Sequence, residues 1–536
     1  MGTKPAKTPA KREGFSSRRV FLFAAIGSAV GLGNIWRFPA VAYKNGGGAF
    51  MIPYIVALLT AGLTFLFFDY AIGHRGRASS PLAFRRLNRK TEFIGWWHMG
   101  ISAVIAIYYA AVIAWAVRYM IFSFNQEWGS DAKTFFMKDF LKVGDPKLSF
   151  DFNPGILIPL VLVWISLIVI MALGVQKGVG AANVVFMPLL IFMFVGLVAY
   201  SLTLPGAMNG LNTLFTPNWG ALTNGEVWVA AYGQIFFSLS IGFGIMVTYA
   251  SYLKLKTDLT GSGAVVGFAN SGFELLAGIG VFAALGFMAQ AQGIAVDKVV
   301  EEGIGLAFIA FPTIISQAPA GALIGFLFFG SLLFAGFTSL ISILEVIIAG
   351  VQDKAGTSRL TSTMIVIIPL AIISTLLMPT ASGLYMLDIL DTFVNNFGIL
   401  AAGLTSIVVI TYGVRALPTL REHLNSVSSF KVGWIWMILL AGVTPLILGY
   451  SLISTLVKTI NKPYGGYPAD LLGIFGWGMV ALLVIGSIVI SFLPWSHKSR
   501  AAEEPPAPPV IGGKLAHTHV DDAALKAHAK TQGEEA

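Results

Sequence analysis

The sequence contains no cysteine and few charged residues. Only 11% of its 536 residues are Asp, Glu, Lys or Arg, whereas soluble domains contain roughly a quarter. A water-soluble protein could not cover its surface with so few charges, and intrinsic disorder is excluded because it requires low hydrophobicity. Without cysteine there are no disulfides or thiolate metal sites. Because 56% of the residues are hydrophobic and the mean hydropathy is +0.77, we predict a polytopic membrane protein.

The net charge of +9 is concentrated in two short segments. Residues 1–19 and 74–92 each hold six Lys or Arg and one acid, so the rest of the chain together carries −1. Short basic loops of this kind stay on the cytoplasmic side of a membrane. The basic charge therefore indicates topology, and we expect no nucleic-acid partner.

Apolar stretches of about 20 residues predict transmembrane helices. We predict twelve, at roughly 19–43, 47–73, 93–125, 154–173, 179–204, 227–253, 262–290, 320–351, 360–379, 384–413, 432–458 and 469–495. The expected organisation is a cytoplasmic tail at 1–14, one transmembrane domain at 15–498 and a disordered cytoplasmic tail at 499–536. The fold class is then an all-α protein of the plasma (inner) membrane, embedded in the lipid bilayer with both termini cytoplasmic.

Paired glycines interrupt the first and the sixth predicted span. Val30-Gly31-Leu32-Gly33 matches Ile241-Gly242-Phe243-Gly244 in residue type, and both pairs of glycines lie in mid-span. Spans one and six begin two successive blocks of five, at about 19–204 and 227–413, with extra helices at about 432–495. Because five is odd, the second block enters the membrane from the opposite side, which predicts an inverted repeat with unwound helices at a central site. The alternative is close helix packing through Gly27-x-x-x-Gly31.

These segments resemble the neurotransmitter:sodium symporter family, and especially its bacterial leucine-transporter-like members. The resemblance is carried by Gly31-Leu32-Gly33-Asn34-Ile35-Trp36-Arg37-Phe38-Pro39, by Asn45-Gly46-Gly47-Gly48-Ala49-Phe50 and by residues 233–244 of the sixth span. It implies a five-plus-five inverted repeat with unwound helices 1 and 6. It also implies sodium-driven uptake of an amino acid or amine by alternating access.

The resemblance implies two sodium ions. The first is expected at the carbonyl of Ala29 and the side chains of Asn34, Ser238 and Asn270, with the substrate carboxylate as a further ligand. The second is expected at the carbonyls of Gly27, Val30 and Ala335 and the hydroxyls of Thr338 and Ser339. All-oxygen sites suit a hard cation. The alternative for both hydroxyls is a hydrogen bond to their own helix.

An α-amino acid is the substrate that the resemblance implies. Its carboxylate is expected on the N–H groups of Leu32 and Gly33 and the hydroxyl of Tyr109, and its ammonium on the carbonyls of Ala29, Phe237 and Ser238 and the hydroxyl of Ser240. The expected side-chain pocket is walled by Ile105, Phe237, Phe243, Ser339 and Ile343. The alternative for Phe237, Phe243 and Ile343 is ordinary helix packing. Monoamine members have an aspartate at the position of Gly31, so glycine here favours a substrate that brings its own carboxylate.

Charged residues inside spans indicate function, because burying them in a membrane is costly. Arg37 and Asp391 resemble the outer gate of the family, with Gln234 near the arginine and with Tyr109 and Phe237 as an aromatic lid. Arg12 and Asp353 resemble the inner gate, supported by Tyr252. Phe15 takes the place of a tryptophan of the family prototype. Glu345 and Asp388 also lie within spans, and no role is predicted for Glu345.

Glu274 lies one helical turn after Asn270. Chloride-dependent members have a neutral residue at this position, so the carboxylate can replace chloride beside the first sodium. We therefore expect uptake without chloride and proton counter-transport by Glu274. A static hydrogen bond between helices is the alternative.

Two other classes of function were weighed. A membrane sensor would bind an amino acid without moving it, and paired gates argue against that class. A membrane enzyme has little support, because the seven histidines lie mostly in loops and tails and form no metal or nucleophile motif. We predict a symporter for a small apolar or aromatic L-amino acid, not an enzyme. The particular amino acid and the oligomeric state are left open.

Overall fold

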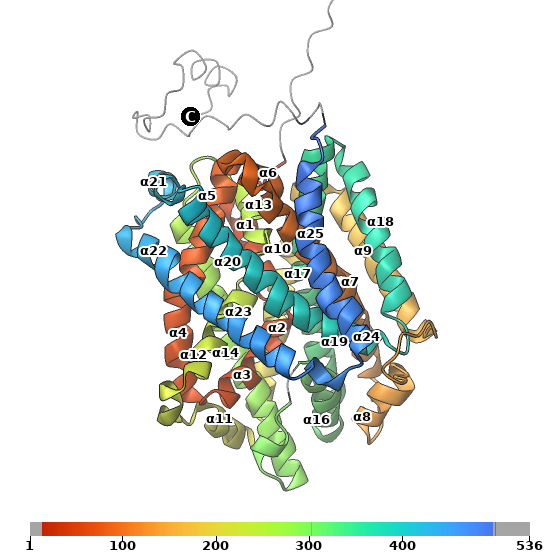
Figure 1. Cartoon of the computed structure of the whole chain (residues 1–536). Coiled ribbons are helices and arrows are strands. Elements are labelled where there is room, and N and C mark those ends of the chain that lie inside the picture. The colour runs from red at the N-terminus through yellow and green to blue at the C-terminus, as the bar shows by residue number, and fades with distance from the viewer. Residues whose placement is uncertain (1–12, 302, 497–498, 500–536) are drawn as a thin grey trace, which may run out of the picture.

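The computed structural model describes residues 13–301, 303–496 and 499 (Figure 1). Ten helices are long and apolar enough to cross a membrane, and a bent pair, Arg18–Ala29 and Leu32–Lys44, makes an eleventh. The predicted sixth span is divided into α12 (Gly225–Ser238) and α13 (Ile245–Ser251). Counting this pair as one span gives the twelve predicted. No β-strand forms among the described residues, and the all-α fold is confirmed.

The bent eleventh span consists of α1 (Arg18–Ala29), α2 (Leu32–Trp36) and α3 (Phe38–Lys44). The other α-helices of more than three residues are α4 (Met51–Ala57), α5 (Leu63–Gly76), α6 (Ser80–Leu87), α7 (Glu92–Phe122), α9 (Pro154–Ala172), α10 (Ala181–Ser201), α11 (Ala207–Phe215), α14 (Leu259–Gln292), α16 (Phe311–Gln317), α17 (Gly321–Ala355), α18 (Arg359–Leu377), α19 (Gly383–Phe393), α20 (Leu400–Val408), α21 (Leu417–Val427), α22 (Trp434–Ile438), α23 (Thr444–Asn461) and α25 (Met479–Phe492).

Short polar side chains start α14 and α18, and glycine ends α17. Asp258 accepts a hydrogen bond from the N–H of Gly261 at the start of α14, and Ser358 accepts one from Thr361 at the start of α18. Gly356 ends α17 with a φ of 63°, a left-handed conformation that glycine adopts without strain. The turn between α17 and α18 is therefore short, and it brings the end of one helix beside the start of the next.

The two broken helices lie side by side at the centre of the bundle. α1 contacts α13 and α2 contacts α12, so the halves pair in opposite directions, as an inverted repeat requires. The first break bends the helix axis by 51°. In the second, Ser240, Gly242 and Gly244 all have positive φ, which an α-helix cannot accommodate. The glycine pairs therefore mark true helix breaks and not only a packing seam.

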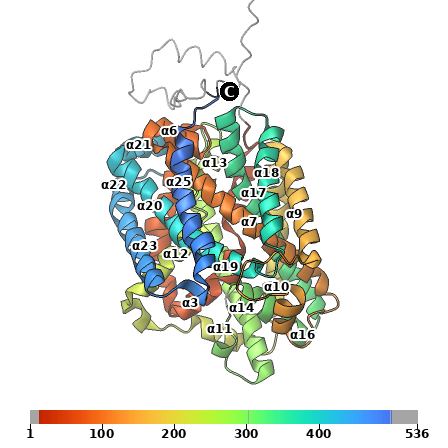
Figure 2. The ribbon, with the colours of Figure 1, turned by 45° about the vertical axis from the view of Figure 1, so that its right-hand side comes forward.

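The outer helices present apolar side chains outward, as a lipid-facing surface requires. Phe192 on α10, Leu446 on α23 and Phe492 on α25 are each at least 75% exposed. In both ribbon views α9 and α18 lie outside α7 and α17, and α25 covers another side (Figures 1 and 2). The long α7 and α17 form the most extensively packed pair of the core.

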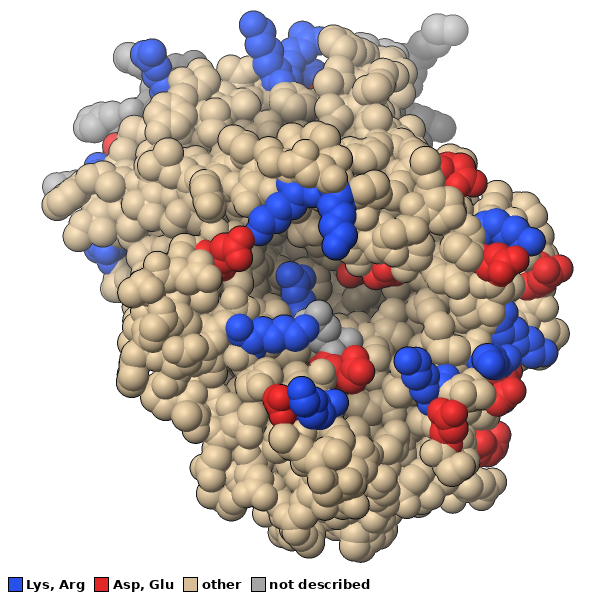
Figure 3. Space-filling model, turned by 60° about the horizontal axis from the view of Figure 1, so that its bottom comes forward, with Lys and Arg blue, Asp and Glu red and all other residues tan. Residues whose placement is uncertain are grey.

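The two ends of the bundle differ. One end carries α6, the start of α1 and the end of α25 (Figure 1). The opposite face is hollowed, and both basic and acidic side chains stand around the hollow (Figure 3). The predicted basic first loop, which contains α6, therefore lies at the end away from the hollow. The locations of the tail residues 1–12 and 500–536 are outside the described residues.

Candidate functional site

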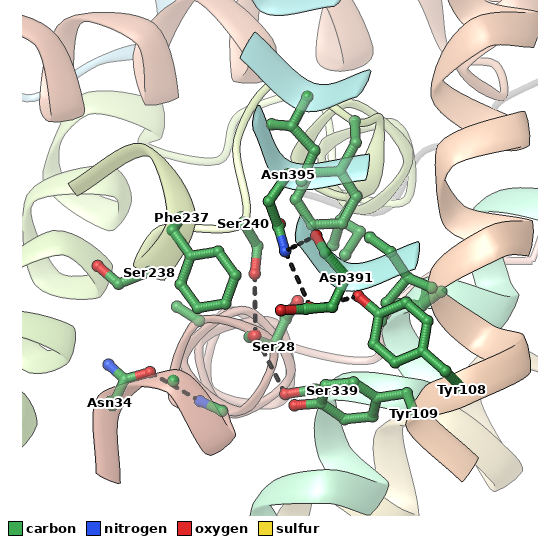
Figure 4. Close-up of a pocket in the computed structure, with 18 residues that line it drawn as sticks. Ser28, Asn34, Tyr108, Tyr109, Phe237, Ser238, Ser240, Ser339, Asp391 and Asn395 are labelled. Atoms are coloured by element: carbon green, nitrogen blue, oxygen red, sulfur yellow. Dashed lines mark hydrogen bonds between the residues drawn. The ribbon is translucent and has the colours of Figure 1, made fainter. Parts of the chain in front are cut away.

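A partly open cavity lies where the two broken helices meet (Figure 4). Ten of the eleven predicted substrate residues line it, and the eleventh, Leu32, lies directly behind them. Ile105, Phe243 and Ile343 supply apolar wall, whereas the helix breaks supply backbone polar groups. A pocket that is mostly apolar with a few converging polar groups is typical of a small-molecule site. The cavity also includes Ser28, Tyr108, Asn395 and Ile399, which the sequence did not nominate.

The start of α2 forms the polar end of the cavity. The N–H of Leu32 donates a hydrogen bond to the Tyr109 hydroxyl over 3.3 Å. A Cβ atom on Gly31 would lie 2.9 Å from the Ser339 hydroxyl and 3.1 Å from that of Tyr109. Glycine at position 31 therefore leaves room for a ligand group among two hydroxyls and a backbone N–H.

Phe237 covers this end of the cavity. A Cβ atom on Gly33 would lie 2.1 Å from the Phe237 ring, so only glycine lets the ring lie against the backbone. The guanidinium of Arg37 stands 4.6 Å from the centre of the same ring. The Phe237 ring thus lines the cavity and also contacts a half-buried cationic group, as expected of a lid.

A chain of amide hydrogen bonds joins the residues predicted for the first sodium. Asn34 accepts from the N–H of Gly31 over 3.0 Å and donates to Asn270 over 2.8 Å. Asn270 in turn donates to the Ser238 hydroxyl over 3.0 Å. All of these side chains are buried, and their oxygens are neutral. That donor set fits a hard monovalent cation.

The residues predicted for the second sodium also lie together, between α1 and α17. The Ser339 hydroxyl donates toward the carbonyls of Ser28 at 3.4 Å and Gly27 at 3.5 Å. The Thr338 hydroxyl donates to Phe334 and Ala335 within its own helix. Thr338 therefore makes the hydrogen bond to its own helix that was the alternative expectation. Because its hydroxyl acts as the donor, the oxygen can still accept.

Glu274 is fully buried beside this polar chain. It accepts hydrogen bonds from Gln234 over 2.6 Å and from the hydroxyl of Tyr54. Tyr54, on α4, also donates toward Ser271, which lies on α14 with Glu274. Gln234, which was expected near Arg37, donates to Glu274 and so links α12 to α14. A buried carboxylate with only neutral donors is a strong site for binding or releasing a proton.

Asp391 is the acidic residue expected in the outer gate. It lines the cavity and accepts hydrogen bonds from Tyr108 over 2.7 Å and from Asn395 over 2.9 Å (Figure 4). Neither donor was predicted, although Asn395 follows Asp391 by one helical turn and Tyr108 precedes Tyr109. Asp388, one turn before Asp391, accepts from Tyr464 and Tyr467, so it fixes the chain after α23 beside the cavity mouth.

The opposite end of the cavity is sealed by aromatic packing. Phe15 is buried against Tyr249 and Tyr252, and its N–H donates to the Tyr252 carbonyl over 3.3 Å. Asp353, expected in the inner gate, accepts from the N–H of Ser79 over 2.7 Å. Its expected partner Arg12 lies outside the described residues. Phenylalanine thus fills the place at which the family prototype has tryptophan.

Glu345 belongs to a network that the sequence did not predict. Its carboxylate accepts hydrogen bonds from the two terminal guanidinium nitrogens of Arg359, at 2.8 Å and 2.6 Å, and from the Tyr252 hydroxyl at 2.6 Å. The short turn after Gly356 places Arg359 next to α17.

A second such carboxylate, Glu92, is buried at the start of α7. It accepts from Arg85 over 2.5 Å, from Lys354 over 2.8 Å and from the indoles of Trp96 and Trp495. This cluster thereby ties the chain after α25 to the start of α7 and to the end of α17. The only sequence feature that could have indicated this cluster is that Glu92 is the single acid in the basic segment 74–92.

A cavity built at two oppositely directed helix breaks in the middle of a multi-span bundle is the arrangement of a secondary transporter. The comparisons with known proteins agree with this class. The model of the sodium:neurotransmitter symporter family matches residues 12–135 and 125–497, and the chain belongs to that family.

The relatives it resembles are named as transporters and not as enzymes. The chain is 39% identical over 482 residues to an uncharacterised sodium-dependent transporter of Methanocaldococcus jannaschii, covering 90% of this chain and 97% of that protein. It is 28% identical to the sodium- and chloride-dependent glycine transporter 2 of Xenopus laevis, covering 88% of this chain and 68% of the relative. It is also 28% identical to the corresponding taurine transporter of Rattus norvegicus, covering 92% and 87%.

Proposed function

We propose that the protein is a symporter that takes up a small apolar or aromatic L-amino acid together with sodium. The observation that carries this proposal is the cavity itself, which combines a backbone N–H and two hydroxyls at Gly31 with apolar walls. An α-carboxylate suits the polar end, because N–H and O–H groups donate to it. The apolar wall of Ile105, Phe243 and Ile343 then receives the side chain.

The position of the acidic groups supports an amino acid over an amine. Asp391 is the only carboxylate among the lining residues, and two side chains of the protein already donate to it. Gly31 brings no carboxylate to the place where the substrate would meet α2. The ammonium of the substrate would instead meet carbonyls of the breaks, beside Ser240, whose hydroxyl donates to the Ser28 carbonyl over 2.9 Å.

Sodium couples to the substrate through the breaks. One ion at Asn34, Asn270 and Ser238 would sit beside the substrate carboxylate, so each would strengthen the binding of the other. A second ion between α1 and α17 would hold the two elements together until it leaves toward the inner side. Transport then follows from differential affinity in two states, since a ligand shifts an equilibrium only through such a difference.

Glu274 would replace chloride in this account. Its carboxylate is held by Tyr54 and Gln234 one turn from Asn270, where it supplies a negative charge next to the first ion. When sodium and substrate leave, the buried carboxylate would take a proton and carry it outward on the return step. Uptake unchanged on replacing chloride by gluconate supports this role, and a chloride requirement contradicts it.

A thermal-shift screen of purified protein tests the substrate class. Twenty amino acids and a panel of monoamines are each tested in sodium chloride buffer and in buffer in which choline chloride replaces sodium chloride. Stabilisation by leucine-like or aromatic amino acids in sodium only is the expected result. Stabilisation by amines, or by amino acids equally in choline, contradicts the proposal. A membrane sensor would pass this screen but would not accumulate its ligand in proteoliposomes.

A further inference from the structure

Asn183 on α10 carries a buried oxygen that nothing in the protein satisfies. The side chain has no exposed surface, and its Nδ2 donates to the Val179 carbonyl one turn earlier over 2.9 Å. Its Oδ1 has no hydrogen-bond donor among the described residues. Because exchanging the two amide atoms would point Oδ1 at a carbonyl oxygen, the amide orientation is set. Leaving such an oxygen unpaired inside an apolar bundle is unfavourable.

The unpaired oxygen points at the first helix break. A Cβ atom on Gly27 would lie 2.7 Å from Asn183 Oδ1 and 3.2 Å from the Cβ of Thr338. Three helices therefore meet at Gly27: α1 through its backbone, α10 through Asn183 and α17 through Thr338. Glycine at position 27 is required because any side chain would displace this oxygen.

The surroundings supply oxygens and no competing donor for Oδ1. Ser339 directs its hydroxyl at the Gly27 and Ser28 carbonyls, and Thr338 directs its own at α17. An amide oxygen among carbonyls and hydroxyls is a site that a cation satisfies and that a hydrogen-bond donor does not occupy. A lone asparagine on an otherwise apolar membrane helix is itself a mark of function.

We propose that Asn183 binds sodium at the second site through Oδ1, as a ligand from α10 in addition to the five expected from α1 and α17. This inference rests on the proposed function, since it assumes that sodium binds between α1 and α17. With α10 as a third wall, the ion keeps an oxygen partner on the side away from Ser339. α10 thereby controls how readily the ion leaves.

Sodium-dependent thermal stabilisation of the purified full-length protein tests the inference. Asn183→Leu keeps the approximate volume and removes the oxygen, whereas Asn183→Asp keeps an oxygen there. We expect Asn183→Leu to raise the sodium concentration for half-maximal stabilisation roughly tenfold, about 1.4 kcal/mol, and Asn183→Asp to stay close to wild type. In sodium-free choline buffer Asn183→Leu should unfold at or above the wild-type temperature, because it removes an unpaired polar atom.

Thr363 on α18 provides a matched control. Its hydroxyl is also buried without a partner among the described residues, but it lies on an outer helix. Thr363→Val should therefore leave the sodium response unchanged. A sodium response of Asn183→Leu equal to that of wild type overturns the inference. A loss of stability in choline buffer that accounts for the whole change in the sodium response also overturns it. If wild type itself shows no sodium response, the proposed function fails instead.

Discussion

Removing the charge of Glu274 should weaken sodium binding unless chloride replaces it. Glu274 follows Asn270 by four residues, so its carboxylate lies about 6–8 Å from an ion held by the Asn270 amide. Two unit charges at about 7 Å and an effective dielectric constant of about 20 interact by roughly 2 kcal/mol. Glu274→Gln should therefore raise the sodium concentration for half-maximal uptake about thirtyfold, while the hydrogen bond from Tyr54 keeps the local fold.

Glu274→Ser tests whether a chloride ion can supply the negative charge in place of the carboxylate. Serine leaves a space lined by the donors of Tyr54 and Gln234, which chloride can occupy. Uptake by this variant should depend on chloride, whereas uptake by wild type should not. The assay is sodium-driven uptake of the best substrate into proteoliposomes in chloride or gluconate, with internal pH followed by a trapped dye.

A surface charge serves as the control. Glu226 is 67% exposed and pairs with Lys458 at the start of α12, so Glu226→Gln removes the same charge far from the ion. Its sodium response should equal that of wild type. Wild-type uptake that requires chloride, or Glu274→Gln with an unchanged sodium requirement, would refute the reasoning.

Three further predictions follow from individual contacts. Gly33→Ala should weaken substrate binding at least tenfold in an equilibrium binding assay, because the new Cβ would lie 2.1 Å from the Phe237 ring. The control Gly233→Ala should bind normally, because a Cβ atom there would have no neighbour within 4 Å. Arg359→Gln should lower stability by about 3–5 kcal/mol, because it leaves its buried carboxylate partner on α17 unpaired; the thermal unfolding midpoint should partly recover when both partners are made neutral. Burial and nearby arginines lower the pKa of His423 to about 3, so the unfolded chain takes up a proton first as pH falls below about 6.5. Wild type should lose about 2 kcal/mol of stability between pH 7.5 and 5 that His423→Phe does not lose, and equal losses in thermal unfolding would contradict this.

The helix breaks could be predicted because their cause is local. Two glycines in a short segment weaken a helix, and the second copy at the matching place in the repeat distinguished breaks from packing. Ser240 adopts a positive φ two residues before Gly242, which no sequence pattern indicated. The cavity residues followed from the same segments, because the breaks and the spans that face them bring most of the wall together.

The two carboxylate networks, around Glu345 and Glu92, could not be predicted, because they depend on how separate helices face one another. Glu345 and Arg359 meet only because the turn after α17 is short and places α18 beside it. Glu92 gathers partners from α6, α17 and the chain after α25, and no spacing in the sequence connects these segments. Asn183 was missed for the same reason, since α10 is apolar on all sides and periodicity does not show which face contacts α1.

The most direct test of the central claim is accumulation of substrate in proteoliposomes that contain only this protein. An inward sodium gradient should drive a labelled apolar or aromatic amino acid above its external concentration, and collapsing the gradient with a sodium ionophore should release it. Equal uptake with potassium in place of sodium, or binding without accumulation, would contradict sodium-coupled transport.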